Sequence, residues 1–127
     1  GELNEFSQEY AETLGETLGY GVVITDLDSI ISVSKLPKKD YKEKSISKEL
    51  EQLIENRETK EIKDENKIPL YKEDSNSYSE QMIMPIISVS GDCIGSIVIV
   101  AKENEKLQEG IDKILKVACS FLGKQVQ

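Results

Sequence analysis

Two Ser-x-x-Lys pairs, Ser32 with Lys35 and Ser45 with Lys48, are the residues whose type and spacing could do covalent chemistry. A serine three residues before a lysine at a helix start is the nucleophile of penicillin-recognising enzymes, which also need a Lys-Thr-Gly element. This sequence has no Lys-Thr-Gly. A serine near a helix start is explained more simply as a cap, because its hydroxyl accepts a hydrogen bond from a free amide group of the first turn. We therefore expect no acyl-enzyme chemistry.

The chain contains no histidine and only two cysteines, Cys93 and Cys119. Without histidine it cannot form a Ser-His-Asp or Cys-His catalytic arrangement, or a metal site built on histidine. Two cysteines cannot complete a four-cysteine zinc site, and both lie in apolar runs typical of buried free thiols in a reducing compartment. The sequence thus predicts a non-catalytic protein with no metal and no resident cofactor.

Residues 34–47 are the segment best suited to bind a small molecule. They form the one locally basic stretch of an acidic chain and lead from a predicted strand into a predicted helix, whose free amide groups favour anions. The predicted pocket rim consists of Ser34, Lys39, Asp40, Tyr41 and Ser45, with Tyr78 behind them. The alternative is an ordinary exposed loop with Tyr41 packed on the core. The sequence leaves both open, because a pocket needs convergent polar groups.

The acidic composition limits the partners of this domain. The chain has 24 acidic and 16 basic side chains and a net charge of -8. Such a chain repels phosphate backbones and anionic membrane surfaces, since affinity for both comes largely from Lys and Arg. No apolar run predicts a membrane span, and the acidic start lacks the pattern of a signal peptide, so we expect a cytoplasmic location. Gly1 is typical of a tag scar, so we expect the natural chain to begin earlier.

Apolar periodicity predicts three helices and a set of strands. We expect helices over residues 3–18, 45–54 and from about 105 onward, and strands over 22–25, 30–33, 68–71, 78–89 and 93–101, with a short edge strand near Ile62 and a turn at 74–77. The strand at 93–101 is apolar on both faces, which indicates a central position. Pro85 has no amide hydrogen and marks a bulge or a locally unpaired stretch.

This order of elements predicts one domain with an α/β (α+β) fold. The turns between strands imply a mostly antiparallel sheet of five to six strands. We expect the two terminal helices on one face of the sheet and the shorter middle helix on the other. A length of 127 residues suits a single domain of this kind.

The terminal helices carry more apolar surface than one sheet face needs. Their apolar residues recur at intervals of three and four, close to the heptad spacing of helix bundles in the last helix. Homodimers commonly bury such a patch, so we predict that the chain forms a homodimer or a higher homo-oligomer. The predicted interface residues are Phe6, Tyr10, Leu14, Leu107, Ile111, Ile114, Ala118, Phe121 and Leu122.

Short motifs spread along almost the whole chain resemble one family of domains. They are Phe6 with Tyr10-Ala11 and Leu18-Gly19, Lys38-Lys39-Asp40-Tyr41 with Lys44-Ser45-Ile46-Ser47, Asn76-Ser77-Tyr78, Pro85-Ile86, Gly91-Asp92 with Ile94-Gly95, and Phe121-Leu122. In this order they resemble the GAF domain, a sensory α/β module. The closer resemblance is to the C-terminal half of the stage V sporulation protein T family, transcription regulators of spore-forming bacteria.

The resemblance implies that residues 1–127 form a GAF-like sensory and dimerisation domain that pairs through its first and last helices. It implies an N-terminal DNA-binding domain of the swapped-hairpin type, absent here, through which alone such proteins contact DNA. It also implies a role as activator or repressor of late sporulation genes in the developing spore compartment. The chromophore-holding histidine and the other ligand motifs of GAF relatives are absent from this sequence.

Two functions follow from these expectations. In the main hypothesis, a small molecule binds between the sheet and residues 35–53, shifts the arrangement of the end helices and so changes DNA binding. In the alternative, apolar side chains fill the cavity, and the domain is a purely structural oligomerisation module. The abundance of Ile, Leu and Met keeps the alternative open.

Overall fold

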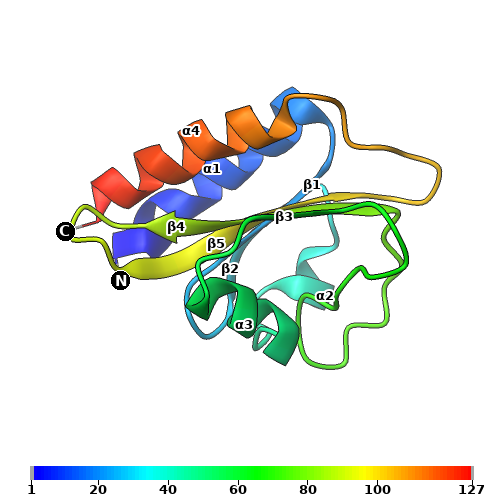
Figure 1. Ribbon diagram of the computed structural model, residues 1–127, viewed down its shortest axis with the longest axis horizontal. Helices are drawn as coiled ribbons and strands as arrows, with labels where there is room; N and C mark the ends of the chain where they lie inside the picture. The colour runs from blue at the N-terminus through cyan, green and yellow to red at the C-terminus, as the bar shows by residue number, and fades with distance from the viewer. Residues whose placement is uncertain (1, 127) are drawn as a thin grey trace.

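Five strands form one antiparallel sheet in the computed structural model, which describes residues 2–126. Their spatial order is β2-β1-β5-β4-β3 (Figure 1). The strands are β1 (Gly21–Thr25), β2 (Ile30–Ser34), β3 (Lys60–Ile62), β4 (Glu80–Ile87) and β5 (Cys93–Ala101). Every neighbouring pair is antiparallel, which confirms the predicted α+β fold.

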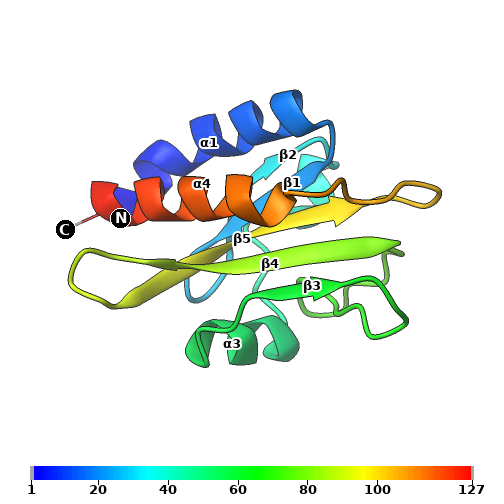
Figure 2. The same cartoon turned by 45° about the horizontal axis from the view of Figure 1, so that its top comes forward.

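Four helices within residues 2–126 cover the two faces of this sheet. α1 (Glu2–Leu18) and α4 (Ile111–Gln125) lie side by side on one face (Figures 1 and 2). α2 (Lys38–Tyr41) and α3 (Lys48–Glu55) lie on the other face. The predicted placement of the terminal helices opposite the middle helix is therefore confirmed. None of these four helices combines the length and the apolar character that a bilayer crossing needs.

Apolar cores lie on both sides of the sheet, and β5 contributes to each. Ile97 and Ile99 point into the core under α1 and α4, whereas Val98 and Val100 point into the core under α3. Alternate side chains of a strand face opposite sides, so a strand covered on both sides must be apolar throughout. The predicted central position of β5 is confirmed.

Single polar or flexible residues set the ends of the elements. Gly19 ends α1 in the left-handed conformation, at φ +82, that glycine adopts without strain. The carboxylate of Asp26 accepts two backbone N–H bonds within the turn of the β1–β2 hairpin. Ser47, and not Ser45, caps α3, because its hydroxyl accepts the N–H of Leu50 at 3.1 Å.

Residues 68–71, predicted as a strand, do not form one. The side-chain amide of Gln81 in β4 donates to the carbonyl of Ile68 at 2.7 Å and accepts from its N–H at 2.9 Å. A single bridge joins Tyr71 to Ile46. The prediction was wrong because side chains, rather than a neighbouring strand, satisfy backbone groups here: Gln81 at Ile68, Ser47 at Pro69 and Asp74 at Leu70.

The last helix begins later than predicted, at Ile111 instead of about residue 105. Leu107 is buried ahead of the helix, and its N–H donates to the buried carboxylate of Glu80 at 2.8 Å. Gly110, at φ +85, then turns the chain into the helix. An apolar residue at helical spacing therefore fills the core from an irregular segment.

Two smaller differences concern the loop after β2 and the β4 proline. Residues 35–44, for which the sequence predicted no helix or strand, include the one-turn helix α2. Pro85 pairs in register with Ser96 of β5, and the bulge falls just beyond it, between Ile86 and Ile87.

Candidate functional site

Two buried tyrosines meet on the α3 side of the sheet. Tyr41 ends α2, Tyr78 precedes β4, and their hydroxyl oxygens lie 2.7 Å apart. The Tyr78 hydroxyl donates to Oδ2 of Asp74 at 2.8 Å. Each hydroxyl has one proton to donate, so the Tyr41 hydroxyl must be the donor to Tyr78. The result is a chain of two O–H donors that ends on a carboxylate.

Asp74, the carboxylate at the end of this hydrogen-bond chain, accepts hydrogen bonds from further donors. Its Oδ2 also accepts the N–H of Leu70 at 2.8 Å, and its Oδ1 accepts the backbone and side-chain N–H groups of Asn76 at 2.9 and 2.8 Å. The Asn76 side chain donates in addition to the Tyr71 hydroxyl at 3.0 Å. These bonds fasten residues 71–77 to the buried tyrosines.

The two hydroxyls stay protonated over the ordinary pH range. Burial raises the pKa of Tyr41 to about 12, although the hydrogen bond with Tyr78 opposes the shift. Burial, together with the hydrogen bonds to Tyr41 and Asp74, raises the pKa of Tyr78 above its ordinary value. Both tyrosines are therefore neutral hydrogen-bonding groups and not bases near neutral pH.

Apolar side chains fill the rest of this sheet face. Leu50 and Ile54 of α3 pack against Val98 and Val100 of β5, and all four are buried. Tyr41 itself is 2% exposed and belongs to the same core. A molecule entering between the sheet and α3 would have to displace one of these side chains.

Ser34 lies on the opposite face of the sheet from Tyr41. It pairs with Val22 of β1, whose side chain belongs to the core under the terminal helices, and its hydroxyl packs directly against Gly15 of α1. Its neighbour Val33 points to the α3 side, so strand alternation turns Ser34 away from the tyrosines. The prediction that Ser34 lines the pocket rim was wrong.

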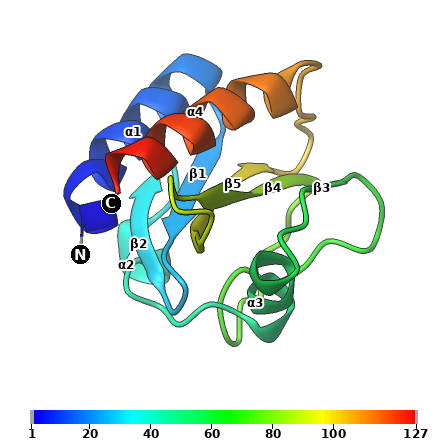
Figure 3. The same cartoon turned by 60° about the vertical axis from the view of Figure 1, so that its left-hand side comes forward.

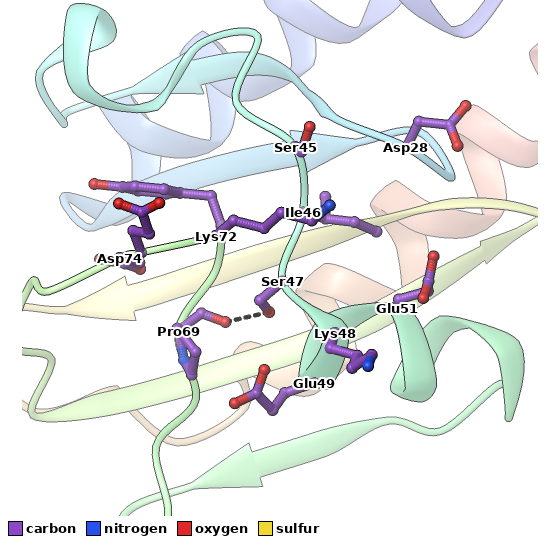
Figure 4. A pocket seen from close by; sticks show the side chains of 12 residues that line it. Asp28, Ser45, Ile46, Ser47, Lys48, Glu49, Glu51, Pro69, Lys72 and Asp74 are labelled. Carbon is purple, nitrogen blue, oxygen red and sulfur yellow. Dashed lines mark hydrogen bonds between the residues drawn. The ribbon is translucent and has the colours of Figure 1, made fainter.

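Three other predicted rim residues, Lys39, Asp40 and Ser45, are exposed. Ser45 lines a hollow of about 750 Å³ between residues 45–51 and 69–74, where Ser47 donates to the Pro69 carbonyl at 2.6 Å (Figure 4). Asp40 lines a smaller hollow nearby, and Lys39 is exposed on α2. Of the six predicted residues, the structure thus brings only Tyr41 and Tyr78 into contact.

The larger of these two hollows has an acidic rim. Its charged side chains are Asp28, Glu49, Glu51, Glu73 and Asp74 against Lys48 and Lys72. Residues 2–126 contain no group of three side chains suited to hold a metal ion. The excess of carboxylates disfavours an anionic ligand here, contrary to what the basic character of residues 34–47 suggested.

The terminal helices leave an apolar strip uncovered, which we call the seam. It comprises Phe6 and Tyr10 of α1 with Ile114, Val117 and Phe121 of α4. Phe121 is 54% exposed and Val117 is 69% exposed. The rings of Tyr10 and Phe121 lie 5.9 Å apart, which makes the strip continuous between the two helices. Figure 3 shows α1 and α4 side by side.

The other five predicted interface residues lie in the core of the chain itself. Leu14, Leu107, Ile111, Ala118 and Leu122 are each at most 8% exposed and pack under the terminal helices. Their side chains have no surface to offer a partner. These five residues therefore lie outside the seam, because the same apolar stripe that faces outward at its edge covers the sheet at its centre.

Comparison with known proteins places the chain in a family. The family model described as stage V sporulation protein T C-terminal, transcription factor, matches residues 2–127. Stage V sporulation protein T of Bacillus subtilis (strain 168) is 38% identical over 129 residues, which cover 99% of this chain and 70% of that protein. The chain belongs to the stage V sporulation protein T C-terminal family. The family resemblance predicted from the sequence is confirmed.

Solved structures, two of them named as GAF domains, share the fold of this chain. The GAF domain of a phosphoenolpyruvate-protein phosphotransferase from Coxiella burnetii has a TM-score of 0.77 at 17% identity, covering 98% of this chain and 82% of that one. The GAF domain of the nutrient sensor CodY from Clostridium difficile has a TM-score of 0.71 at 20% identity, covering 94% and 83%. The free methionine-R-sulfoxide reductase of Thermoplasma acidophilum has a TM-score of 0.75 at 16% identity, covering 98% and 94%. These likenesses show the fold alone.

The sequence did not single out two important residues of this stage V sporulation protein T domain. Val117, the most exposed residue of the seam, lies three residues after Ile114 and four before Phe121, so helical spacing pointed to it. Asp74 was predicted as part of a turn. Nothing in the sequence signals that its carboxylate reaches Tyr78.

The raised tyrosine pKa values predict alkaline destabilisation of this stage V sporulation protein T domain. The folded pKa of Tyr41, about 12, lies above the unfolded value of 10.0, so its contribution is complete below pH 10 and is lost between pH 10 and 12. We expect the free energy of unfolding to fall by about 1 kcal/mol per pH unit in this window. Urea unfolding at pH 9 and 11 measures this loss, and Tyr41→Phe should reduce it. An equal loss in both proteins would contradict the assignment.

Proposed function

We propose that this domain is the non-catalytic regulatory half of a sporulation transcription factor. It joins copies of the protein through the seam and couples a small-molecule signal on the opposite sheet face to DNA binding. DNA contact is made by an N-terminal domain outside this chain, in the cytoplasm of the developing spore. The net charge of -8 agrees with DNA contact by another domain, because binding to phosphates needs Lys and Arg.

The exposed seam is the observation that carries the proposal. Its five apolar residues come from both terminal helices and lie on one side of the molecule. Symmetric dimers bury such a strip against its own copy, since each side presents the same apolar surface. Pairing removes from water Val117 and Phe121, which are the two most exposed residues of the seam.

Regulation requires that the two faces of the sheet communicate. A ligand that binds one arrangement of the end helices more tightly shifts their population, and with it the geometry of the attached DNA-binding domains. The Tyr41, Tyr78 and Asp74 cluster is where we propose that the signal is read. It is a buried polar group beneath an exposed segment, and the CodY domain with this fold is named as cofactor-binding.

One observation favours a second candidate, a purely structural oligomerisation module. The sheet face under α3 is filled by Tyr41, Leu50, Ile54 and Val98, which leaves a ligand no preformed chamber. In this alternative the tyrosine cluster only fastens residues 71–77. The seam serves pairing in both candidates, so they differ in the response to metabolites.

Two measurements on the same protein test the proposal. Sedimentation should show a dimer or higher oligomer, because the seam is apolar. A thermal-shift screen of metabolites should find a compound that stabilises the fold by a few °C when present well above its Kd. Tyr41→Ala should abolish that shift. A strictly single-subunit species at high concentration would refute the pairing, whereas an oligomer that no compound stabilises would favour the structural alternative.

A further inference from the structure

A second hollow lies between α4 and the β4 side of the sheet, away from the tyrosine cluster. It has a volume of about 670 Å³, within the range typical of small-molecule sites, about 300–1,000 Å³. Its lining residues are Arg57, Thr59, Met84, Pro85, Ile87, Asp112, Lys113, Lys116, Cys119 and Ser120. β3 pairs only with Gln81–Ile83, so among residues 2–126 the edge of β4 that faces away from β5 has no partner strand from Met84 onward. Figure 2 shows the short β3 at this edge of the sheet.

The charge around this hollow is opposite in sign to the net charge of the protein. Its lining includes three basic side chains, Arg57, Lys113 and Lys116, and one acidic side chain, Asp112. Four other hollows of the described chain each carry at least as many acidic as basic side chains. In a protein of net charge -8, a locally basic hollow attracts anions that the rest of the surface repels.

Arg57 occupies a backbone position that suits glycine. It follows the last turn of α3 with φ +54, the left-handed conformation that glycine adopts without strain at helix ends. A side chain there costs stability that a glycine would recover. The chain thus keeps an arginine beside the hollow where glycine would be less strained. Four other described residues, Lys35, Glu43, Glu73 and Asn104, also have positive φ, so this conformation by itself marks no site.

We propose that this hollow binds an organic carboxylate with an apolar body. Met84, Pro85 and Ile87 offer apolar contact to the body, and Arg57, Lys113 and Lys116 offer charge-assisted hydrogen bonds to the carboxylate. The bound molecule rests against α4, which carries Val117 and Phe121 of the seam on another side. This site is separate from the tyrosine cluster and does not depend on the signal proposed there.

The two methionines of the chain provide the test. Met84 lines the hollow, whereas Met82 does not, so labelling the methionine methyl groups with carbon-13 gives one reporter and one internal reference. Titration with decanoate, below its micelle-forming concentration, should shift the Met84 signal in a saturable manner and leave Met82 nearly unchanged. Decyltrimethylammonium, a cation with the same chain, should bind at least tenfold more weakly. Equal binding of the two ions, or an unmoved Met84 signal, would overturn the proposal.

Three variants separate binding from folding. Arg57→Gly should raise Tm by about 2 to 5 °C and weaken decanoate binding about three- to tenfold, two effects of opposite sign. Lys116→Ala should weaken binding by a similar factor, and Lys124→Ala, which removes a lysine of the same helix outside the hollow, should not. An Arg57→Gly protein that binds decanoate as well as the wild type refutes the role of the guanidinium, whatever its stability. If Lys116→Ala and Lys124→Ala weaken decanoate binding equally, the attraction comes from the net charge of the protein and not from this hollow.

Discussion

If copies pair through the seam as proposed, replacing Phe121 with glutamate is expected to convert the oligomer into single subunits without unfolding them. Phe121 is 54% exposed within one copy, so the carboxylate stays in water when the chain is alone. In a symmetric pair two such carboxylates would enter an apolar strip without partners, which costs several kcal/mol. We expect the dissociation constant of the dimer to rise on the order of a hundredfold or more.

Sedimentation equilibrium over a range of concentrations measures this change. Ser120→Glu is the matched control, since Ser120 is the exposed neighbour of Phe121 on α4 and lies outside the seam. Circular dichroism and a cooperative urea transition establish that both variants are folded. A folded Phe121→Glu protein that sediments like the wild type would remove the seam from the interface. Dissociation of both variants would point to charge in general and not to this strip.

The predicted interface residues divide into buried and exposed ones because an apolar stripe has a centre and an edge. Helical spacing identifies the whole stripe, from Leu14 to Phe121, but it does not say how much the sheet covers. The sheet takes the centre, including Ile111 and Leu115, and leaves the edge at Val117 and Phe121. That division depends on how α1 and α4 are set over the strands, which is tertiary information.

The strands and turns followed more closely from local residues. Gly19 at a helix end and Asp26 in a turn each have one good structural interpretation. The doubly apolar run of β5 has one as well, and its predicted central position was confirmed. Residues 68–71 failed because a strand needs a neighbour as well as an apolar pattern. The amide of Gln81 took the place of that neighbour.

The candidate site shows the same limit. Strand alternation alone separates Ser34 from Val33, yet the sequence does not reveal which face α2 covers. Tyr41 and Tyr78 are 37 residues apart, and their hydroxyl contact depends on how α2 and the segment before β4 meet. Residue type therefore predicted the two tyrosines as candidate site residues. Only the structure shows that Asp74 accepts the hydrogen bond of Tyr78.

Gly123→Ala is expected to destabilise the domain by about 2 kcal/mol, although alanine is the better helix former. A Cβ at Gly123 would lie 1.9 Å from the backbone carbonyl oxygen of Ile87, so α4 or the β4–β5 hairpin must move. Helix propensity favours alanine by about 1 kcal/mol, whereas forcing backbone apart in a packed region costs about 1–3 kcal/mol and sometimes more. The steric clash outweighs the gain in helix propensity, because the carbonyl oxygen of Ile87 belongs to the backbone and cannot rotate away.

Urea unfolding of Gly123→Ala and Ser120→Ala makes the comparison direct. Ser120 is exposed three residues earlier in α4, so its replacement should change the free energy of unfolding by less than about 0.5 kcal/mol. If Gly123→Ala proves as stable as Ser120→Ala, the end of α4 does not press on the hairpin as the structure has it. A large loss instead means that this close contact fixes the end of α4. The contact between Gly123 and Ile87 then connects the sheet to the part of α4 that carries Phe121. The proposed regulation through the end helices requires such a connection.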